Sequence, residues 1–497
     1  MSIAMPAPDA DVIARRDGFI AALRTLIPGE GVIADEKGLR TYECDGLAAY
    51  RALPLAVVLP ETVEEVSAVM ALAGEHNVKV VPRGSGTGLS GGALPLTDGI
   101  ILGLGKFNRI LEIDYANRCV TVQPGVSNLA ISQAVSAAGF YYAPDPSSQI
   151  ACSIGGNVAE NSGGVHCLKY GVTTNNLLGL EMVLMSGEVI RLGGKHFDSD
   201  GYDLLGILTG SEGLLGVVTE VTVRILPKPS SVQALLLGFA DVVDAGDCVA
   251  RIIAAGIIPA GLEMMDKPAV KAAEDYCHAG YPLDVEALLI CELDGPAAEV
   301  SELVDRVEAI ARESRATTLR RSQSEEERAR FWLGRKSAFP AVGRISPDYY
   351  CMDGTIPRGQ LAHVLARMRE LSAHHGLGVV NVFHAGDGNL HPLILYDAAR
   401  EGDLQKTEAL AGDILRLCVE VGGVLSGEHG IGIEKRDLMG AMFTEDDLKQ
   451  QQRIKCAFDP EGLLNPGKVF PVLHRCAELG AMHVHHGKLP FPDLPRF

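Results

Sequence analysis

The sequence predicts an α+β protein with two or three domains. Three observations support this fold class. Short runs of β-branched and apolar residues recur along the chain, helix-like stretches lie between many of them, and two glycine-rich segments, residues 82–92 and 152–173, interrupt the first half. With 497 residues, of which 47% are hydrophobic, the chain can bury more than one core.

The first two predicted units cover residues 1–50, a helical lead, and residues 51–230, an α+β domain. This domain opens with a strand at "PLAVVLP", a helix that starts at the Pro-Glu-Thr of residues 60–62, and a strand at "VKVVP". Further strands are expected at "GIILGL", "RILEID", "CVTVQP" and between residues 177 and 226, with a helix near residues 128–139. The segment "PKPSS", residues 227–231, marks the boundary.

The second half is predicted to hold another α+β domain, residues 231–420, and a C-terminal segment, residues 421–497, that completes the site. Helix-like stretches such as "VSELVDRVEAIARES" alternate there with strands such as "ALLICELDG". From about residue 405 the chain turns helical again, interrupted by "VGGVLSGEHGIGIEKRD". The tail "AMHVHHGKLPFPDLPRF" carries histidines that suit a metal, but an ordered surface tail is expected.

The formal charge of −19 excludes some partners. Nucleic acid needs clustered Lys and Arg, and anionic lipid repels an acidic surface, so neither is expected to bind directly. No apolar stretch reaches the roughly 20 residues that cross a bilayer, and the N-terminus lacks the apolar core of a signal peptide. The sequence therefore predicts a cytoplasmic protein that meets a membrane only through partners.

The 11 cysteines are scattered and include no C-x-x-C pair. This spacing argues against a disulfide scaffold and against an iron–sulfur cluster, which needs closely spaced thiolates. Any electron relay beyond the chain's own cofactor is therefore expected to belong to another protein.

The segment "PRGSGTGLSGG", residues 82–92, is a candidate diphosphate cradle. Its glycines permit positive φ angles and leave backbone N–H groups uncovered. A Rossmann arrangement is disfavoured because no amphipathic helix follows, and a Walker loop because no Gly-Lys-Ser/Thr closes the segment. A flexible structural loop is the alternative. Two such glycine-rich segments, residues 82–92 and 152–173, indicate a long ligand that lies along exposed backbone. A flavin dinucleotide is the natural candidate.

The segment "HAGDGNLHP", residues 384–392, suggests a metal site. If Asp387 and Gly388 form a two-residue type I′ turn, His384 stands opposite His391 on one face of a hairpin. Cross-strand partners have Cβ atoms roughly 4.5–5.5 Å apart, so two imidazoles converge on one ion. Two polar residues flanking a loop are the alternative, and a metal site needs a third ligand.

Six segments together carry a family resemblance. They are "PRGSGTGLSGG", "IGGNVAENSGG", "TGSEGLLGVVTEVTVRILP", "HAGDGNLHP", "SGEHGIG" and "LLNPGKV". In this order they resemble the vanillyl-alcohol-oxidase type flavoproteins, and within them the FAD-linked 2-hydroxy-acid dehydrogenases. The chain looks like the flavin subunits of bacterial glycolate oxidases, with D-lactate and D-2-hydroxyglutarate dehydrogenases as further relatives. The resemblance implies an FAD-binding domain, an α+β substrate (cap) domain and a C-terminal helical return.

The resemblance also implies the residues around FAD. The pyrophosphate would lie on Arg83, Gly84, Ser85, Gly86 and Thr87, and Asn465 would lie near the isoalloxazine. The rest of the cofactor path would be lined by Pro144, Ser153, Gly156, Asn157, Gly163 and Val218. Several relatives attach FAD through a histidine, but residues 82–92 contain none. Non-covalent FAD is therefore expected, with His166 as the alternative point of attachment.

The third metal ligand implied in this way is Glu428 in "SGEHGIG". Two imidazoles and a carboxylate suit a divalent cation such as Zn, Mn or Fe, with open positions for substrate. His429 follows, and in extended backbone its side chain points away from that of Glu428, so it is the candidate general base. A merely buried Glu428–His429 pair is the alternative.

Arg335 in "FWLGRKSAF" is the candidate clamp for the substrate carboxylate, since guanidinium binds a carboxylate with two parallel hydrogen bonds. Its neighbour Lys336 is expected to point elsewhere. The hydroxyglutarate-specific relatives carry a lysine where this chain has Cys351, and that lysine serves a second substrate carboxylate. Its absence favours a short monocarboxylate.

The expected reaction is oxidation of a small 2-hydroxy acid, glycolate first and D-lactate second, to the 2-oxo acid. Arg335 would hold the carboxylate, the metal the hydroxyl, and His429 would remove the proton while hydride passes to flavin N5. The partners implied are iron–sulfur and second flavin-like subunits of a glycolate oxidase complex, through which the chain would reach the inner membrane and its quinone. The alternatives are a D-lactate dehydrogenase, a non-catalytic flavin relay subunit and an NAD-linked dehydrogenase. The sequence leaves open the metal, the physiological acceptor and the oligomeric state.

Overall fold

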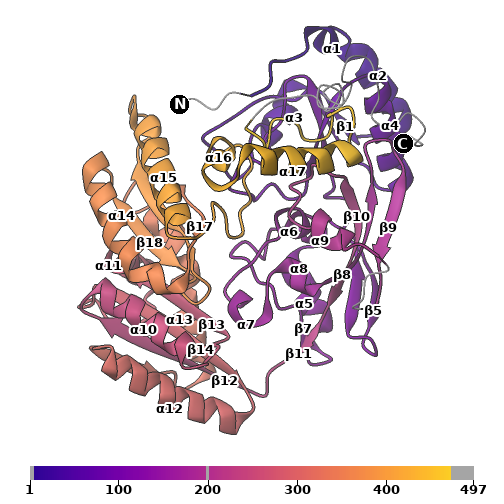
Figure 1. The fold of residues 1–497 in the computed structure, drawn as a ribbon. Helices are drawn as coiled ribbons and strands as arrows, with labels where there is room; N and C mark the ends of the chain where they lie inside the picture. The colour runs from indigo at the N-terminus through magenta and orange to yellow at the C-terminus, as the bar shows by residue number, and fades with distance from the viewer. Residues whose placement is uncertain (1–4, 197–200, 472–497) are drawn as a thin grey trace.

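The computed structural model describes residues 5–196 and 201–471. Figure 1 shows two lobes side by side. The first lobe comprises residues 5–196 and 201–227 together with residues 445–471, and the second lobe comprises residues 231–425. Between them lies the return loop, residues 426–432, which leads the chain from the second lobe back to the first. The histidine-rich tail considered above lies outside the described residues.

The first sheet of the first lobe has the strand order β1-β2-β4-β3, with β2, β4 and β3 parallel. Its strands are β1 (Val32–Ile33), β2 (Ala56–Val58), β3 (Lys79–Arg83) and β4 (Gly99–Gly103). The helices are α1 (Ala10–Ala14), α2 (Arg16–Leu26), α3 (Glu36–Leu39), the 3-10 helix η1 (Arg40–Tyr42) and α4 (Val63–Glu75). Helix α4 begins as predicted, because Thr62 and Glu65 form a reciprocal capping box.

The second sheet is antiparallel, with the order β5-β6-β10-β8-β9. Its strands are β5 (Ile110–Asp114), β6 (Cys119–Val122), β8 (Leu177–Val183), β9 (Val189–Gly193) and β10 (Val217–Arg224), and β7 (Phe140–Tyr141) pairs with β11 (Leu226–Pro227). The helices are α5 (Asn128–Ser136), α6 (Ile154–Glu160), α7 (Cys167–Tyr170), α8 (Thr173–Asn176) and α9 (Leu204–Leu208). The glycine-rich residues 152–173 thus contain α6 and α7, short helices that the sequence pattern did not predict.

The second lobe is built on a seven-stranded sheet with the order β15-β12-β14-β13-β18-β20-β16. The strands are β12 (Ser231–Phe239), β13 (Gly261–Asp266), β14 (Ala287–Gly295), β15 (Thr318–Arg321), β16 (Asp348–Cys351), β18 (Val379–Phe383) and β20 (Pro392–Tyr396), and β17 (Gly354–Thr355) pairs with β19 (Asn389–Leu390). The helices are α10 (Val242–Ala254), α11 (Lys267–Cys277), α12 (Ala297–Glu313), α13 (Glu325–Val342), η2 (Arg358–Gln360), α14 (Leu361–His375) and α15 (Asp403–Glu420).

The chain ends by returning to the first lobe. After the return loop come η3 (Arg436–Leu438), α16 (Met439–Met442) and α17 (Glu445–Phe458), and α17 crosses the first lobe in Figure 1. Beyond α17, Leu464 forms a parallel bridge with Val80 at the edge strand β3. The predicted C-terminal return is therefore part of the first lobe's sheet edge.

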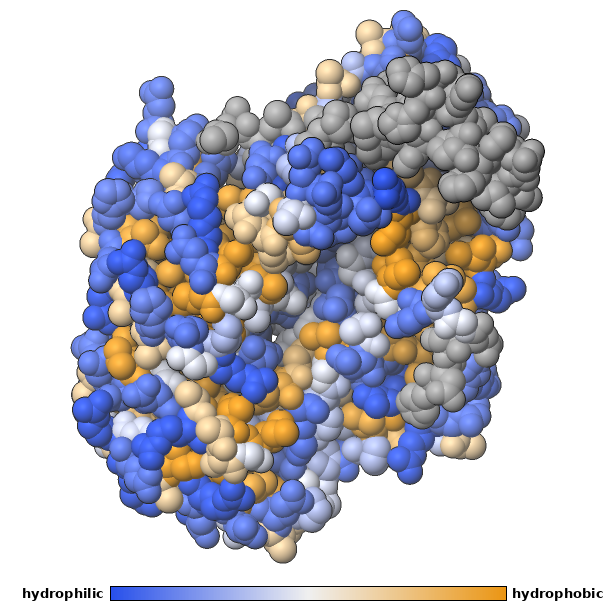
Figure 2. Space-filling view, viewed as in Figure 1, coloured by the Kyte–Doolittle hydropathy of each residue, from blue (hydrophilic) through white to orange (hydrophobic). Residues whose placement is uncertain are grey.

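Figure 2 shows a hollow in the surface between the two lobes. Polar contacts join the lobes: His166 of the first lobe lies between Asp145 and Glu292, and Lys169 donates to Asp294 of the second lobe. The ten cysteines of the described chain are all free thiols. No helix in residues 5–196 and 201–471 is long and apolar enough to cross a membrane.

Candidate active site

A cavity of about 400 Å³ runs between the lobes, and it is lined by both glycine-rich segments of the first lobe. Nine of the twelve residues predicted to bind FAD line it, namely Arg83, Gly84, Ser85, Gly86, Thr87, Ser153, Gly156, Asn157 and Val218. At one end the lining passes to His391, Glu428 and His429. The predicted cofactor path and most of the predicted reaction site therefore share one cavity.

The loop of residues 82–92 needs its glycines for close packing. Gly86 has φ of +71°, and a Cβ there would lie 2.3 Å from the Arg83 guanidinium. Two buried oxygens of cavity-lining side chains, Ser153 Oγ and Glu160 Oε2, have no hydrogen-bond partner in the described part of the chain. Bare backbone and the unpaired Ser153 hydroxyl, which can donate a hydrogen bond, suit an anionic group such as the FAD pyrophosphate.

The other three predicted cofactor residues lie behind the cavity wall. Asn465 is buried and donates Nδ2 hydrogen bonds to Gly92 O (3.0 Å) and Glu212 O (2.7 Å), so it fixes the end of the glycine loop. Pro144 O accepts a hydrogen bond from Asn128 Nδ2 (3.0 Å). The backbone N–H of Gly163 donates to Glu428 Oε2 (3.1 Å), at the other end of the site.

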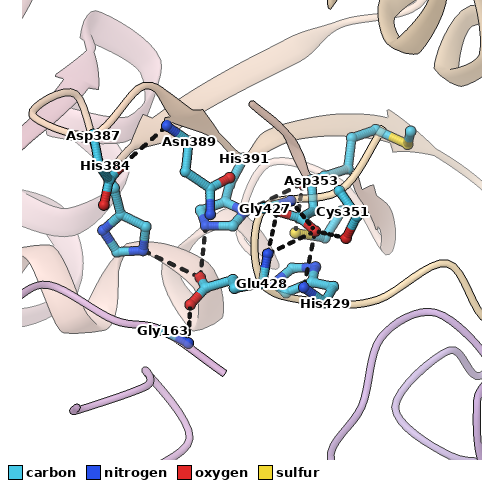
Figure 3. A network of polar contacts seen from close by, with 12 residues as sticks. Gly163, Cys351, Asp353, His384, Asp387, Asn389, His391, Gly427, Glu428 and His429 are labelled. Atoms are coloured by element: carbon cyan, nitrogen blue, oxygen red, sulfur yellow. Dashed lines mark hydrogen bonds and ion pairs between the residues drawn. The ribbon is translucent and has the colours of Figure 1, made fainter. Parts of the chain in front are cut away.

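The three predicted metal ligands converge, as Figure 3 shows. His384 Nε2 lies 3.3 Å and His391 Nε2 3.0 Å from the same oxygen of Glu428, Oε1. The donor atoms of the three residues all lie within 4.8 Å of one another. Burial raises the pKa of Glu428, but hydrogen bonds and charge from the two histidines outweigh burial and hold it well below its ordinary value.

The second nitrogen of each imidazole is also fixed. His384 Nδ1 lies 2.8 Å from Glu263 Oε1, and His391 Nδ1 lies 3.3 Å from the carbonyl oxygen of Met352. Histidines that ligate metals commonly donate their other ring N–H to a carboxylate or a backbone carbonyl, which fixes tautomer and orientation. Both histidines are therefore oriented to present Nε2 to a common point.

The hairpin that carries the two histidines differs from the predicted one. Strands β18 and β20 pair Asn381 with Pro392, and His384 bridges Asn389 rather than His391. Four residues, 385–388, form the turn, and the predicted two-residue type I′ turn is wrong. The reason is that Gly386 N donates to Leu262 O of the neighbouring strand β13 (2.9 Å), so its backbone cannot pair with Asn389.

The register error amounts to two residues and so preserves the face of each side chain. His384 and His391 are diagonal neighbours on one face, with ring centroids 5.0 Å apart. The convergence of the imidazoles was therefore predicted correctly from a turn that was predicted wrongly.

His429 lies beside this cluster and lines the cavity. Its ring stacks on His391, with centroids 4.9 Å apart and planes inclined by 16°. Burial lowers the pKa of His429 to about 4, so the imidazole is neutral at pH 7 and can accept a proton. Cys351, His391 and His429 form a second group of donors within 4.8 Å, which shares His391 with the first.

Arg335 and Lys336 are placed differently from each other. Arg335, in α13, is 1% exposed, lies outside the cavity lining and pairs with Glu263 Oε2 at 2.6 Å. Lys336 is exposed and lines the cavity near Phe339 and Pro340. The expectation that Lys336 points away from the site is therefore wrong. Arg335 reaches the ligand cluster through Glu263, which also holds His384.

The match to known proteins divides the chain close to the boundary between the lobes at residue 228, and the second match runs on through the return loop into the first lobe. Residues 54–193 match the family model of the FAD binding domain, and residues 228–469 match that of the FAD linked oxidases, C-terminal domain. The chain belongs to the FAD-linked oxidases. It is 58% identical over 490 residues to the glycolate oxidase subunit GlcD of Escherichia coli (strain K12), covering 99% of this chain and 97% of that protein. It is 32% identical to a D-lactate dehydrogenase of Anaerostipes hadrus, covering 91% and 97%.

Solved structures share the fold of this FAD-linked oxidase at low sequence identity. p-Cresol methylhydroxylase with substrate bound has a TM-score of 0.79 and 18% identity, covering 94% of this chain and 98% of that one. The isoeugenol complex of 4-ethylphenol oxidase from Gulosibacter chungangensis has a TM-score of 0.76 and 21% identity, covering 95% and 99%. The predicted α+β fold of the vanillyl-alcohol-oxidase type is confirmed, and so is the prediction of an FAD-linked oxidoreductase.

The alternative point of flavin attachment in this FAD-linked oxidase, His166, is occupied by other contacts. Its Nδ1 lies 2.8 Å from Asp145 Oδ2 and its Nε2 3.4 Å from Glu292 Oε1. Burial lowers its pKa, but the two carboxylates outweigh burial and raise it to about 10. A charged imidazole held on both sides has no free lone pair, and His166 does not line the cavity.

Four acids near the site of the FAD-linked oxidase escaped the sequence analysis: the buried Glu212, Glu263 and Asp353, and the half-buried Glu160. Glu263 and Asp353 stand in otherwise apolar segments, "GLEMMD" and "YYCMDGT". An acidic residue within an apolar segment could have indicated a functional carboxylate, because a buried carboxylate needs hydrogen-bond or ion-pair partners. Identifying those partners required the three-dimensional structure.

Proposed function

We propose that this FAD-linked oxidase oxidises a small 2-hydroxy acid, glycolate first and D-lactate second, to the 2-oxo acid. One observation carries the proposal: the donor cluster of His384, His391 and Glu428, with His429 beside it, meets the end of the glycine-lined cavity. The names of relatives agree, since they include a glycolate oxidase subunit and a D-lactate dehydrogenase.

In this proposal a divalent cation, Zn, Mn or Fe, is held by His384, His391 and Glu428. Two imidazoles and one carboxylate suit such ions and leave open positions. The fixed second nitrogens of both histidines support this assignment. When bound, the cation supplies a Lewis acid that lowers the pKa of the substrate hydroxyl.

His429 is the proposed general base. Its imidazole lines the cavity, and its pKa of about 4 leaves it neutral at physiological pH. A base of such low pKa takes a proton only from a hydroxyl whose own pKa has been lowered. The position of His429 beside the ligand cluster meets this need, because the cation held there would lower the pKa of the substrate hydroxyl. FAD, when bound along the cavity, supplies the two-electron acceptor.

Arg335 is the proposed clamp for the substrate carboxylate, since guanidinium forms bidentate hydrogen bonds with carboxylates. Its present partner, Glu263, also contacts His384, so Arg335 lies one residue away from the ligand cluster. Cys351 adjoins the same cluster and brings no positive charge for a second carboxylate, which favours a short monocarboxylate.

We further propose that FAD is bound non-covalently and that iron–sulfur and second flavin-like subunits of a glycolate oxidase complex carry electrons onward to quinone of the inner membrane. The glycine loop contains no histidine, and the cysteines are scattered without a C-x-x-C pair. The isolated chain should therefore reduce artificial dyes but reduce quinone only slowly. Rapid quinone reduction by the isolated chain contradicts the need for partners.

The absorption spectrum of the bound flavin tests the proposed reaction. Under anaerobic conditions, glycolate or D-lactate should bleach the flavin, and the order of the two rates gives the preferred substrate. A yellow protein that no 2-hydroxy acid bleaches is a relay subunit rather than the proposed enzyme. A protein that needs added NAD for turnover is an NAD-linked dehydrogenase.

A further inference from the structure

The return loop presents Glu428 and His429 to the site, and a single buried carboxylate holds this part of its backbone. Asp353 is 0% exposed. It accepts hydrogen bonds from the backbone N–H groups of Gly427 (3.1 Å) and His429 (2.9 Å), and also from that of Glu428 at 3.2 Å. Ser426 Oγ donates to it as well, at 2.6 Å. Figure 3 shows the bonds from Gly427, Glu428 and His429 converging on Asp353.

Three successive N–H groups that point at one carboxylate fix the backbone of the segment. Lys435 Nζ, which is also buried, lies 3.2 Å from Asp353 Oδ2 and donates to Gly430 O at 2.8 Å. The first half of the return loop is thus wrapped around an Asp353–Lys435 ion pair. Glu212 of the first lobe holds the other half, by accepting from the N–H groups of Ile431 and Gly432.

Asp353 is itself tied to the strand that carries His391. Its neighbour Met352 donates its N–H to Pro392 O (3.1 Å), and Met352 O lies 3.3 Å from His391 Nδ1. On the other side, Thr355 and Val424 exchange two backbone hydrogen bonds just before the return loop. Asp353 therefore stands between the segments that supply His391 and Glu428.

We propose that Asp353 is a positioning residue that sets Glu428 and His429 against the His384–His391 hairpin, through the backbone of residues 427–429. The inference rests on the proposed function for the roles of Glu428 and His429. Asp353 itself lies outside the cavity lining and acts on Glu428 and His429 through these backbone hydrogen bonds.

The test is Asp353→Asn in the FAD-loaded protein. The amide turns an N–H donor toward backbone N–H donors, so the loop loses part of its support. Zn²⁺ affinity, measured without substrate by competition with a chromophoric chelator, should fall by about 10–100-fold. Single-turnover flavin reduction should slow by about the same factor even at saturating Zn²⁺, because added ion refills the site but does not return His429 to its place.

The matched control is Asp266→Asn. Asp266 is also a buried aspartate of the second lobe, and it accepts three hydrogen bonds, from Ala269 N and from the backbone and side-chain nitrogens of Asn381. None of them comes from the return loop. Asp266→Asn should keep Zn²⁺ affinity and flavin reduction, whatever it does to the melting temperature.

Asp353 has no positioning role if Asp353→Asn keeps both the Zn²⁺ affinity and the rate of flavin reduction. The same conclusion follows if Asp353→Asn and Asp266→Asn lower these two quantities equally. If Asp353→Asn does not yield folded FAD protein, Ser426→Ala decides. It removes the 2.6 Å bond to Asp353 and the 3.3 Å bond that Ser426 Oγ accepts from Lys435 Nζ, and it should weaken Zn²⁺ binding by about tenfold. An unchanged Ser426→Ala overturns the proposal. Failure of the proposed function looks different, because the wild-type flavin is then not reduced by any 2-hydroxy acid while the Zn²⁺ measurement still reports on Asp353.

Discussion

Gly163 donates its backbone N–H to Glu428 Oε2 at 3.1 Å across 265 residues of sequence. The bond joins the first lobe to the proposed metal ligand on the return loop. Since His384 and His391 belong to the second lobe, the candidate site needs both lobes and the loop between them. Single substitutions at this junction can therefore distinguish the proposed roles of metal ligand, general base and carboxylate clamp.

Glu428→Gln and His429→Asn should fail in different ways. His429→Asn should keep FAD and metal but slow flavin reduction by roughly 10²–10⁴-fold, the usual contribution of a positioned base. Glu428→Gln should lose metal affinity and regain part of its activity at high metal concentration, because mass action restores occupancy. Single-turnover flavin reduction across a metal titration measures both. If His429→Asn is the variant that metal rescues, the two roles must be exchanged.

Arg335→Lys should raise KM for the 2-hydroxy acid by about 10–100-fold, because lysine cannot form the bidentate bond, while its positive charge still neutralises Glu263. Lys336→Gln is the matched variant next to it, and it should change KM little. Steady-state kinetics with an artificial dye gives both values. If Lys336→Gln raises KM more than Arg335→Lys does, the substrate carboxylate binds Lys336, which lines the cavity.

Acid or heat should release FAD into the supernatant, since the residues 82–92 contain no histidine and His166 is held by two carboxylates. The colour of the precipitate after acid treatment measures this. A yellow precipitate, with flavin attached to a peptide after digestion, would show a covalent link. Mass spectrometry of that peptide then identifies the attached residue.

His166→Asn should destabilise the protein in a pH-dependent manner. The folded pKa of about 10 lies above the ordinary value of 6.5, so the ion pairs of His166 stabilise fully below about pH 6.5 and are lost as the pH rises through 10. The difference in unfolding free energy between wild type and variant should therefore shrink from pH 6.5 to pH 10, as measured by urea unfolding.

Tyr170→Phe is the control for this pH dependence. It removes the hydrogen bond from Tyr170 to Asp294 at the same junction of the lobes. The loss of unfolding free energy should be the same at every pH from 6.5 to 10. A constant difference for His166→Asn would mean that the imidazole is uncharged in the folded state.

Local patterns predicted much of the fold. The helix start at residues 60–62 and the strand "VKVVP" depend on residues close in sequence, and the structure has α4 and β3 there. The short helices α6 and α7 were missed because glycine-rich segments have low helix propensity, and contacts with the rest of the lobe override it.

Part of the candidate site could be predicted, because histidine and glutamate in short motifs indicate metal binding or proton transfer. His384 and His391 stand in a short motif of unusual composition, Glu428 and His429 were implied by the family resemblance, and the four side chains converge. Glu263 and Asp353 were not predictable, because their partners lie 121 and 74 to 76 residues away and depend on strand register. The Gly386–Leu262 bond that changed the hairpin turn is likewise a contact between strands distant in sequence.

The bridge between Val80 and Leu464 has a consequence for synthesis of the chain. Strand β3 is an edge strand that lies beside the glycine loop, and its outer partner, Leu464, is synthesised only after the whole seven-stranded sheet of the second lobe. Until then the edge offers unpaired N–H and C=O groups to other strands, a known route to aggregation. The nascent first lobe therefore keeps an open edge until the second lobe and α17 have been made, and a truncation before Leu464 leaves that edge open permanently.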